Sequence, residues 1–159
     1  FLQTQAGNNN PYNQDNPTAW LDWDRCESLA DHLRFVRRLI GFRQAHLTLC
    51  RSRFWRDDIR WYGVGPSTDL GDDSHSLAFA LRGAAEGDCD LYVMINAYHE
   101  PLTFAIQEGH SGCWRRAIDT GLPSPDDIAH PDLGPLLHSC EYRVQARSVV
   151  VLARETALA

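Results

Sequence analysis

The residues best suited to bind a ligand lie in one polar stretch near the start of the chain, Gly-Asn-Asn-Asn-Pro-Tyr-Asn-Gln-Asp-Asn at positions 7–16. Their amide, carboxylate and phenol groups donate and accept hydrogen bonds, a mixture that suits a ligand covered with hydroxyl groups, such as a sugar. The same residue types also gather in loops for their turn conformations, so both interpretations stay open. The candidate binding residues are Asn8, Asn9, Asn10, Tyr12, Gln14, Asp15 and Asn16.

The segments around this stretch must position it. No hydrophobic periodicity runs through residues 7–16, which predicts a loop. Asp24 and Glu27 have the spacing of a capping box, in which Asp24 accepts a backbone N–H and Glu27 reaches back to the cap. From Cys26 to His46 apolar residues recur at helical spacing, which predicts one amphipathic α-helix. Its apolar stripe consists of Leu29, Leu33, Phe35, Val36, Leu39, Ile40 and Phe42.

Beyond Leu47 the sequence consists of short aromatic and aliphatic runs separated by turn residues, which is typical of strands. Eight such runs without intervening helices predict a mainly β fold, an antiparallel β-sandwich. Residues 149–152 are continuously apolar and predict a central strand. The connection from Gly121 to Ser139 holds four prolines, which disfavour ladder pairing, so we expect an ordered surface loop there. The expected strands are residues 53–55, 58–62, 77–82, 90–96, 102–107, 114–119, 142–146 and 148–154.

Other reactive side chains lack a recognisable arrangement. The five cysteines form no close pair typical of zinc or redox motifs, and the histidines have no metal-ligand spacing. A calcium site around Asp15, Asp22 and Asp24 is disfavoured because these acids do not follow an EF-hand pattern. We therefore expect no metal and no cofactor. The five tryptophans could stack on sugar rings, but core packing is the stronger prediction for most of them.

Composition places the chain in an ordinary globular class. A chain of 159 residues is long enough to bury a core. Its net charge of −6 argues against a nucleic-acid partner, because phosphate binding requires clustered basic residues. No apolar run is long enough to span a bilayer, so no membrane association is expected. Free cysteines without a signal peptide indicate a reducing, cytoplasmic setting. The sequence begins Phe1-Leu2-Gln3, without an initiator Met, and looks like a piece of a larger protein.

Several motifs resemble one enzyme family. The opening polar string followed by Trp20-Leu21-Asp22-Trp23 resembles the loop and helix start found late in the catalytic barrel of isoamylase-type glycogen debranching enzymes, members of the α-amylase family. The resemblance continues in the same order at residues 90–97, 114–121, 142–144 and 147–152. The chain departs from the family pattern at Gln3, where Arg is usual, at Asn13, where Cys is frequent, and at Leu47, where Pro is frequent.

The resemblance implies a domain organisation and a function. Residues 1–48 would be the last loop and helix of a (β/α)8 barrel, and residues 49–159 a C-terminal β-sandwich. The parent protein would hydrolyse α-1,6 branch linkages in glycogen or related α-glucans. The family's catalytic acids precede the segment that this chain resembles, so no catalytic residue is assigned here. The opening loop would lie near the glucan cleft, because active sites of such barrels lie at the C-terminal ends of their strands.

Two further expectations follow. The alternative function is a free-standing carbohydrate-binding sandwich with a helical extension, without catalytic activity. Such a module has no use for a barrel loop and helix, which favours the enzyme segment. We also expect the apolar stripe of the helix at residues 26–46 to dock on the sandwich or to pair with a second copy, because large exposed apolar patches mark interfaces.

Overall fold

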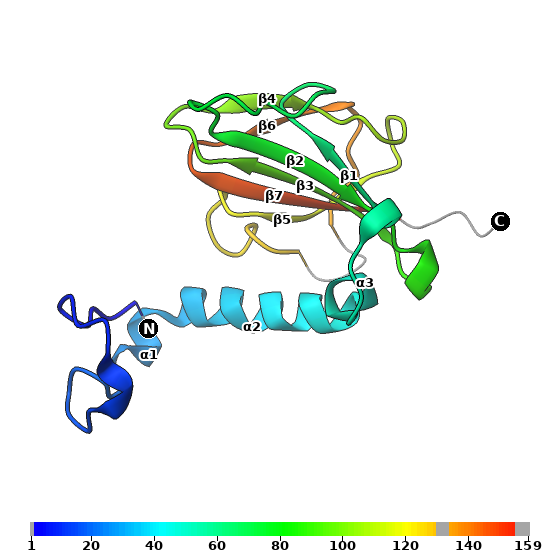
Figure 1. Ribbon diagram of the computed structural model, residues 1–159. Helices are drawn as coiled ribbons and strands as arrows, with labels where there is room; N and C mark the ends of the chain where they lie inside the picture. The colour runs from blue at the N-terminus through cyan, green and yellow to red at the C-terminus, as the bar shows by residue number, and fades with distance from the viewer. Residues whose placement is uncertain (1, 130–133, 155–159) are drawn as a thin grey trace. The chain divides into compact units, whose positions relative to one another are not determined.

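The computed structural model describes residues 2–129 and 134–154, and the chain divides into two compact units, Phe1–Arg37 and Arg38–Ala159 (Figure 1). The first unit holds the polar loop, with a 3-10 turn at Pro11–Asn13, then α1 (Arg25–Ser28) and the first half of α2 (Ala30–Ala45). The second unit holds the end of α2, α3 (Leu47–Cys50) and all of the strands. The predicted boundary between residues 48 and 49 concerns where the barrel ends, and it stays a prediction.

The predicted helix forms, but in pieces. Leu29 has φ −115° and ψ 27° and separates α1 from α2. The predicted capping box is wrong: the side chain of Asp24 makes no cap hydrogen bond. The reason is that Asp24 is already helical, with φ −64° and ψ −19°, whereas a capping residue needs an extended backbone to aim its side chain at the first free N–H groups. Of the apolar stripe, Phe42 is buried while Val36, Leu39 and Ile40 are exposed.

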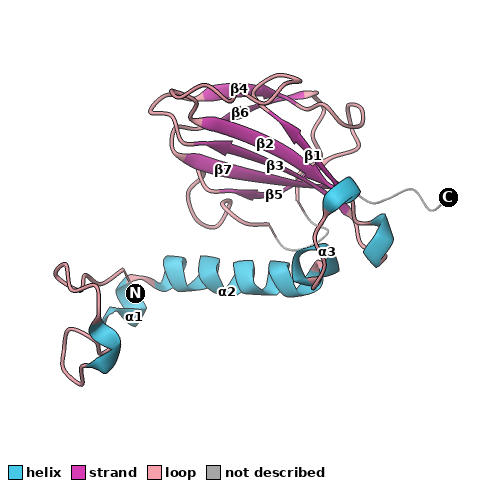
Figure 2. Ribbon diagram, viewed as in Figure 1, coloured by secondary structure: helices cyan, strands magenta, loops and turns pink. Residues whose placement is uncertain are grey.

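The strands form two antiparallel sheets (Figure 2). The larger sheet has five strands in the order β1-β2-β3-β7-β5, and the smaller pairs β4 with β6. The apolar run 149–152 lies in β7, between β3 and β5, as predicted. The strands are β1 (Ile59–Tyr62), β2 (Ser76–Leu81), β3 (Asp90–Asn96), β4 (Leu102–Ala105), β5 (Arg115–Asp119), β6 (Glu141–Val144) and β7 (Ser148–Arg154).

The hydrophobic core lies between the two sheets. Alternate residues of β2, β3 and β7 point to one face of the larger sheet, because side chains alternate along a strand. They meet Phe104 of β4 and Val144 of β6, both fully buried. This packing confirms the predicted mainly β, antiparallel sandwich. The core cluster consists of Ala78, Ala80, Tyr92, Met94, Phe104, Ile106, Trp114, Val144, Val150 and Leu152.

One of the eight predicted strands is wrong. Residues 53–55 form no strand: a bend at residues 52–53 and an irregular stretch at 54–55 lead into a 3-10 turn at Arg56–Asp58, so seven strands are present in the described residues. Phe54 is 86% exposed, and Arg53 forms an ion pair with Glu86 at 2.8 Å instead of joining a ladder. The aromatic pair Phe54-Trp55 gave the sequence a strand-like composition without a neighbouring strand to pair with.

The proline-rich connection is only partly on the surface. Ile128 is buried and bridges to Ile118 of β5, while Leu136 bridges to Arg115. Residues 130–133, the middle of the predicted loop, lie outside the described residues. Within the described residues no helix is long and apolar enough to cross a bilayer. All five cysteines are free, as predicted.

Candidate functional site

The polar loop is a series of tight turns. Gly7 has φ +78°, a left-handed conformation that glycine adopts without steric cost. The backbone N–H of Asn8 donates to the carbonyl of Gln5 at 3.0 Å, and the N–H of Asn10 donates to the side-chain oxygen of Asn8 at 3.0 Å. Pro11, with its fixed φ, starts the 3-10 turn. Asparagine thus serves here partly as a turn residue.

Four of the seven predicted binding residues hydrogen-bond within the loop. The Gln14 side-chain oxygen accepts from the amides of Asn8 at 3.0 Å and Asn16 at 3.3 Å. Asp15 accepts the indole N–H of Trp20 at 2.6 Å. These contacts tie the two ends of the loop together, so Asn8, Gln14, Asp15 and Asn16 fix its shape.

Gln3 ties the loop to the segment before α1. Its amide donates to the carbonyl of Trp20 at 2.5 Å, and its oxygen accepts the N–H of Asp22 at 2.9 Å. The family's usual Arg at this position could not accept the second of these bonds, because a guanidinium has no acceptor. The substitution to Gln is therefore compatible with this loop, and Gln3 is a structural residue.

The other three predicted residues present free polar groups. Within the described residues the side chains of Asn9, Asn10 and Tyr12 make no hydrogen bond. Tyr12 is 88% exposed. Its ring lies at an open depression lined by Gln5, Pro11, Tyr12, Gln14, Ala19 and Trp20.

This depression combines aromatic surfaces with amide groups. Trp20 is 55% exposed, while its indole N–H is held by Asp15. An aromatic face beside hydrogen-bonding amides suits a sugar ring, which has apolar C–H faces and a rim of hydroxyl groups. Among the described residues no carboxyl group lines this depression, whereas glycoside hydrolysis requires a pair of them flanking a shared space.

Sequence reasoning missed the exposure of the tryptophans. Trp114 is 2% exposed and packs in the core, but Trp20, Trp23 and Trp61 are more than half exposed. The prediction that most tryptophans are core residues is therefore wrong. For Trp20 a signal was available, because it follows a polar loop and lies outside the predicted apolar stripe of the helix, which begins at Leu29.

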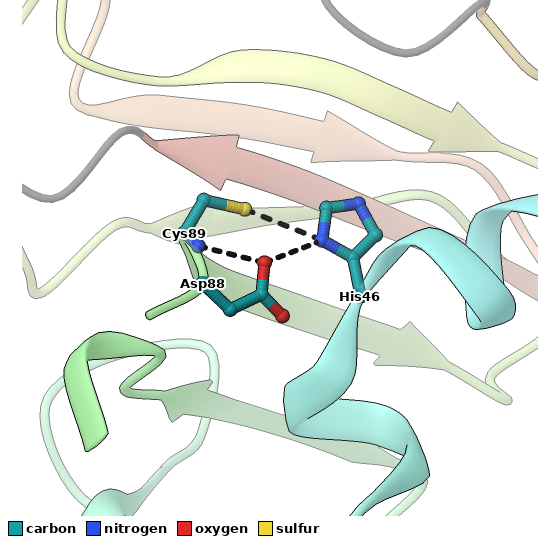
Figure 3. A group of neighbouring side chains, drawn as sticks. All are labelled: His46, Asp88 and Cys89. Atoms are coloured by element: carbon teal, nitrogen blue, oxygen red, sulfur yellow. Dashed lines mark hydrogen bonds and ion pairs between the residues drawn. The ribbon is translucent and has the colours of Figure 1, made fainter. Parts of the chain in front are cut away.

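A second cluster was also missed in the sequence. His46, Asp88 and Cys89 converge although 42 residues separate His46 from Asp88 (Figure 3). A Cys beside a His could be a nucleophile, but burial and then the negative charge of Asp88 raise the pKa of the Cys89 thiol to about 12. The thiol is therefore protonated at neutral pH, which argues against nucleophilic catalysis.

Comparison with known proteins identifies the family. The family model described as "Isoamylase 1-3, C-terminal" matches residues 60–154, more than half of the chain. The chain belongs to the isoamylase C-terminal family. The resemblance noted in the sequence is thereby confirmed.

Relatives align along nearly the whole length of this chain. An isoamylase from Flavobacterium sp is 33% identical over 172 residues, an alignment that covers 95% of this chain and 22% of the relative. A glycogen debranching enzyme from Dickeya chrysanthemi is 31% identical, with 98% of this chain and 22% of the relative covered. The chain thus spans about a fifth of the length of these relatives.

Solved structures show the same fold. Pullulanase type I from Bacillus subtilis, complexed with maltose, matches with a TM-score of 0.71 and 22% identity, covering 98% of this chain and 20% of the pullulanase. A pullulanase from Paenibacillus barengoltzii, in complex with maltohexaose and α-cyclodextrin, matches with a TM-score of 0.65 and 27% identity, covering 97% and 21%. The chain therefore has the fold of a C-terminal portion of these pullulanases.

Proposed function

We propose that the chain is the C-terminal segment of a glycogen debranching enzyme that hydrolyses α-1,6 linkages in glycogen or related α-glucans. The observation that supports this most strongly is the extent of the alignments. The family model begins at residue 60, but an alignment covering 95% of the chain must include most of the residues before it. The alignment with isoamylases thus includes the polar loop and α2 in addition to the sandwich.

The segment contributes structure and contacts, and the catalytic acids lie elsewhere in the longer protein. Residues 1–48 complete the catalytic barrel, and residues 49–159 form the sandwich that stabilises it. The exposed residues Val36, Leu39 and Ile40 on α2 are suited to packing within the longer protein, and in the isolated chain to pairing with a second copy. The five free cysteines favour a cytoplasmic location.

The loop residues divide into two roles. Asn9, Asn10 and Tyr12 contact the glucan directly, because their side chains make no hydrogen bond to any described residue and are available to a ligand. Asn8, Gln14, Asp15 and Asn16 position them through the bonds described above. The two roles are separable in a hybrid enzyme in which this chain replaces the aligned C-terminal part of the Flavobacterium isoamylase.

In that hybrid, Tyr12→Ala lowers kcat/KM for amylopectin by about three- to tenfold, since it removes one aromatic contact. Its melting temperature stays that of the unsubstituted hybrid. Gln14→Ala lowers both kcat/KM and the melting temperature, because it releases two amides. Asn13→Ala is the matched control, since Asn13 is an exposed residue of the same loop. Equal kinetics for Tyr12→Ala and Asn13→Ala would exclude Tyr12 from substrate contact.

The alternative, a free-standing carbohydrate-binding module, gives different results. The isolated chain should release no reducing ends from glycogen, which both functions predict. The transcript should encode several hundred residues upstream, including the acid-bearing motifs of the α-amylase family. A start codon directly before Phe1, together with tight binding of the isolated chain to glycogen in affinity electrophoresis, would establish the binding module instead.

A further inference from the structure

Three different donor atoms converge where the end of α2 meets the turn before β3. His46 directly follows α2, and Asp88 and Cys89 directly precede β3, all within the second unit. The Nδ1 atom of His46 lies 3.0 Å from Oδ1 of Asp88 and 3.5 Å from Sγ of Cys89 (Figure 3). Among the described residues, this is the one group of three His, Cys, Asp or Glu side chains whose donor atoms lie within 4.8 Å of one another.

The surrounding backbone holds these groups in place. The Asp88 carboxylate accepts the N–H of Thr48 at 3.0 Å through Oδ2 and the N–H of Cys89 at 2.7 Å through Oδ1. The His46 ring packs beside Phe42, with ring centroids 4.2 Å apart. The side chains of His46 and Asp88 are only 13% and 8% exposed. The arrangement is therefore largely fixed before any ligand binds.

The turn that carries Asp88 and Cys89 depends on glycine. A Cβ atom on Gly83 would lie 2.1 Å from the carbonyl oxygen of Cys89, closer than any real contact. Gly87 has φ +65°, the left-handed region that favours glycine. These two positions let the turn fold tightly enough to bring Asp88 and Cys89 to the end of α2.

Two of the three separations between the donor atoms are close to those in the coordination sphere of zinc, and the third, between Oδ1 of Asp88 and Sγ of Cys89, lies within 4.8 Å. Bonds of about 2.0–2.1 Å to nitrogen and oxygen and about 2.3 Å to sulfur, at tetrahedral angles, place N and O about 3.3 Å apart and N and S about 3.6 Å apart. The two separations from Nδ1 of His46, 3.0 and 3.5 Å, would have to change by only a few tenths of an ångström. A thiolate and a carboxylate together neutralise the charge of a divalent ion. Because Ca²⁺ and Mg²⁺ prefer oxygen ligands, a site with a thiolate and an imidazole favours a transition metal instead.

We propose that His46, Asp88 and Cys89 bind one divalent transition-metal ion of the zinc class, with water as the fourth ligand. On binding, the Cys89 thiol releases its proton to solvent, and the imidazole proton moves from Nδ1 to Nε2. The metal then joins the end of the helical segment to the start of β3 and stabilises the second unit. This site is independent of the proposed debranching function.

Cobalt is the probe for this site. Untagged, metal-free, reduced chain should bind one Co²⁺ per molecule and show thiolate-to-cobalt charge-transfer absorption, which Zn²⁺ abolishes by displacement. Cys89→Ser should remove that absorption band. His46→Gln and Asp88→Asn should each weaken binding by at least about tenfold, since even the loss of a supporting contact has that effect. The matched controls are Cys113→Ser and Cys140→Ser, which change a half-buried and an exposed cysteine outside the site and should leave binding unchanged.

A measurement on the unsubstituted chain avoids any folding defect in the variants. Zinc-edge X-ray absorption should show one sulfur ligand at about 2.3 Å and three lighter ligands. A zinc shell without sulfur would overturn the proposal, as would binding of less than one ion per chain. Cobalt absorption that survives in folded Cys89→Ser would overturn it too, and the three side chains would then be a hydrogen-bonded cluster only.

Discussion

The hydroxyl of Tyr142 connects the two sheets of the sandwich, and its removal is a sharp test of the packing. Tyr142 belongs to β6 of the smaller sheet, and its O–H donates to Oδ2 of Asp119 at 2.7 Å. Asp119 ends β5 of the larger sheet and is only 3% exposed. Its other oxygen, Oδ1, accepts the N–H of Gly121 at 2.9 Å. Tyr142→Phe therefore deprives a buried carboxylate of one partner without opening a cavity.

The expected cost follows from the charge of the acceptor. A hydrogen bond to a charged group contributes about 1.5–3 kcal/mol. A loss of about 2 kcal/mol lowers the melting temperature of a chain this size by about 4–8 °C. The matched control is Tyr98→Phe, a half-buried tyrosine of the same unit whose hydroxyl makes no hydrogen bond within the described residues.

The effect should depend on pH in one direction. Burial and then the hydrogen bond to Asp119 raise the pKa of Tyr142 to about 12. Because the folded-state pKa is raised, the stabilisation is complete below about pH 10 and is lost as the pH rises through about 12. Urea unfolding followed by circular dichroism gives the free energy of unfolding at each pH. At pH 7 the loss caused by Tyr142→Phe should be about 2 kcal/mol, and at about pH 11.5 it should be smaller. Equal stability of Tyr142→Phe and Tyr98→Phe at pH 7 would refute this reasoning.

Two other predictions concern the turn before β3 and the exposed helix face. Gly83→Ala should destabilise the second unit by roughly 1–3 kcal/mol, because the added carbon overlaps the carbonyl oxygen of Cys89. Urea unfolding measures this loss, with Gly65→Ala as the control, because a Cβ atom at Gly65 would meet no atom within 4 Å. The isolated chain should self-associate through Val36, Leu39 and Ile40, so sedimentation should show a concentration-dependent dimer that Ile40→Asp abolishes. A monomer at every concentration, with α2 still protected from amide exchange, would contradict the second prediction.

The fold was largely predictable because strand periodicity is a local property. β2 and β4 alternate apolar and small or polar residues, and β7 is apolar throughout, so each was visible in the sequence. Residues 53–55 were wrongly predicted as a strand, because an exposed aromatic pair has the composition of a strand but no neighbouring strand with which to form hydrogen bonds. The capping prediction at Asp24 failed because Asp24 itself has a helical backbone conformation, although α1 begins at the next residue, as the pattern indicates.

The sites were predictable only in part, because they depend on contacts between distant residues. The loop was found from composition, but only the structure separates Gln14, whose oxygen accepts from two amides, from Asn9 and Tyr12, whose side chains make no hydrogen bond within the described part of the chain. His46 and Asp88 are brought together by the path of α2 and the turn at Gly83–Gly87, and no spacing rule in the sequence indicates that encounter.

The central claim is that this chain completes a debranching enzyme, and the activity of the hybrid isoamylase tests it most directly. Reducing ends released from amylopectin should be measured for the hybrid and for the Flavobacterium isoamylase ended before its aligned segment. We predict that the hybrid hydrolyses α-1,6 linkages and leaves unbranched amylose intact, while the shortened enzyme is inactive. A hybrid that folds cooperatively yet shows no more activity than the shortened enzyme would contradict the account.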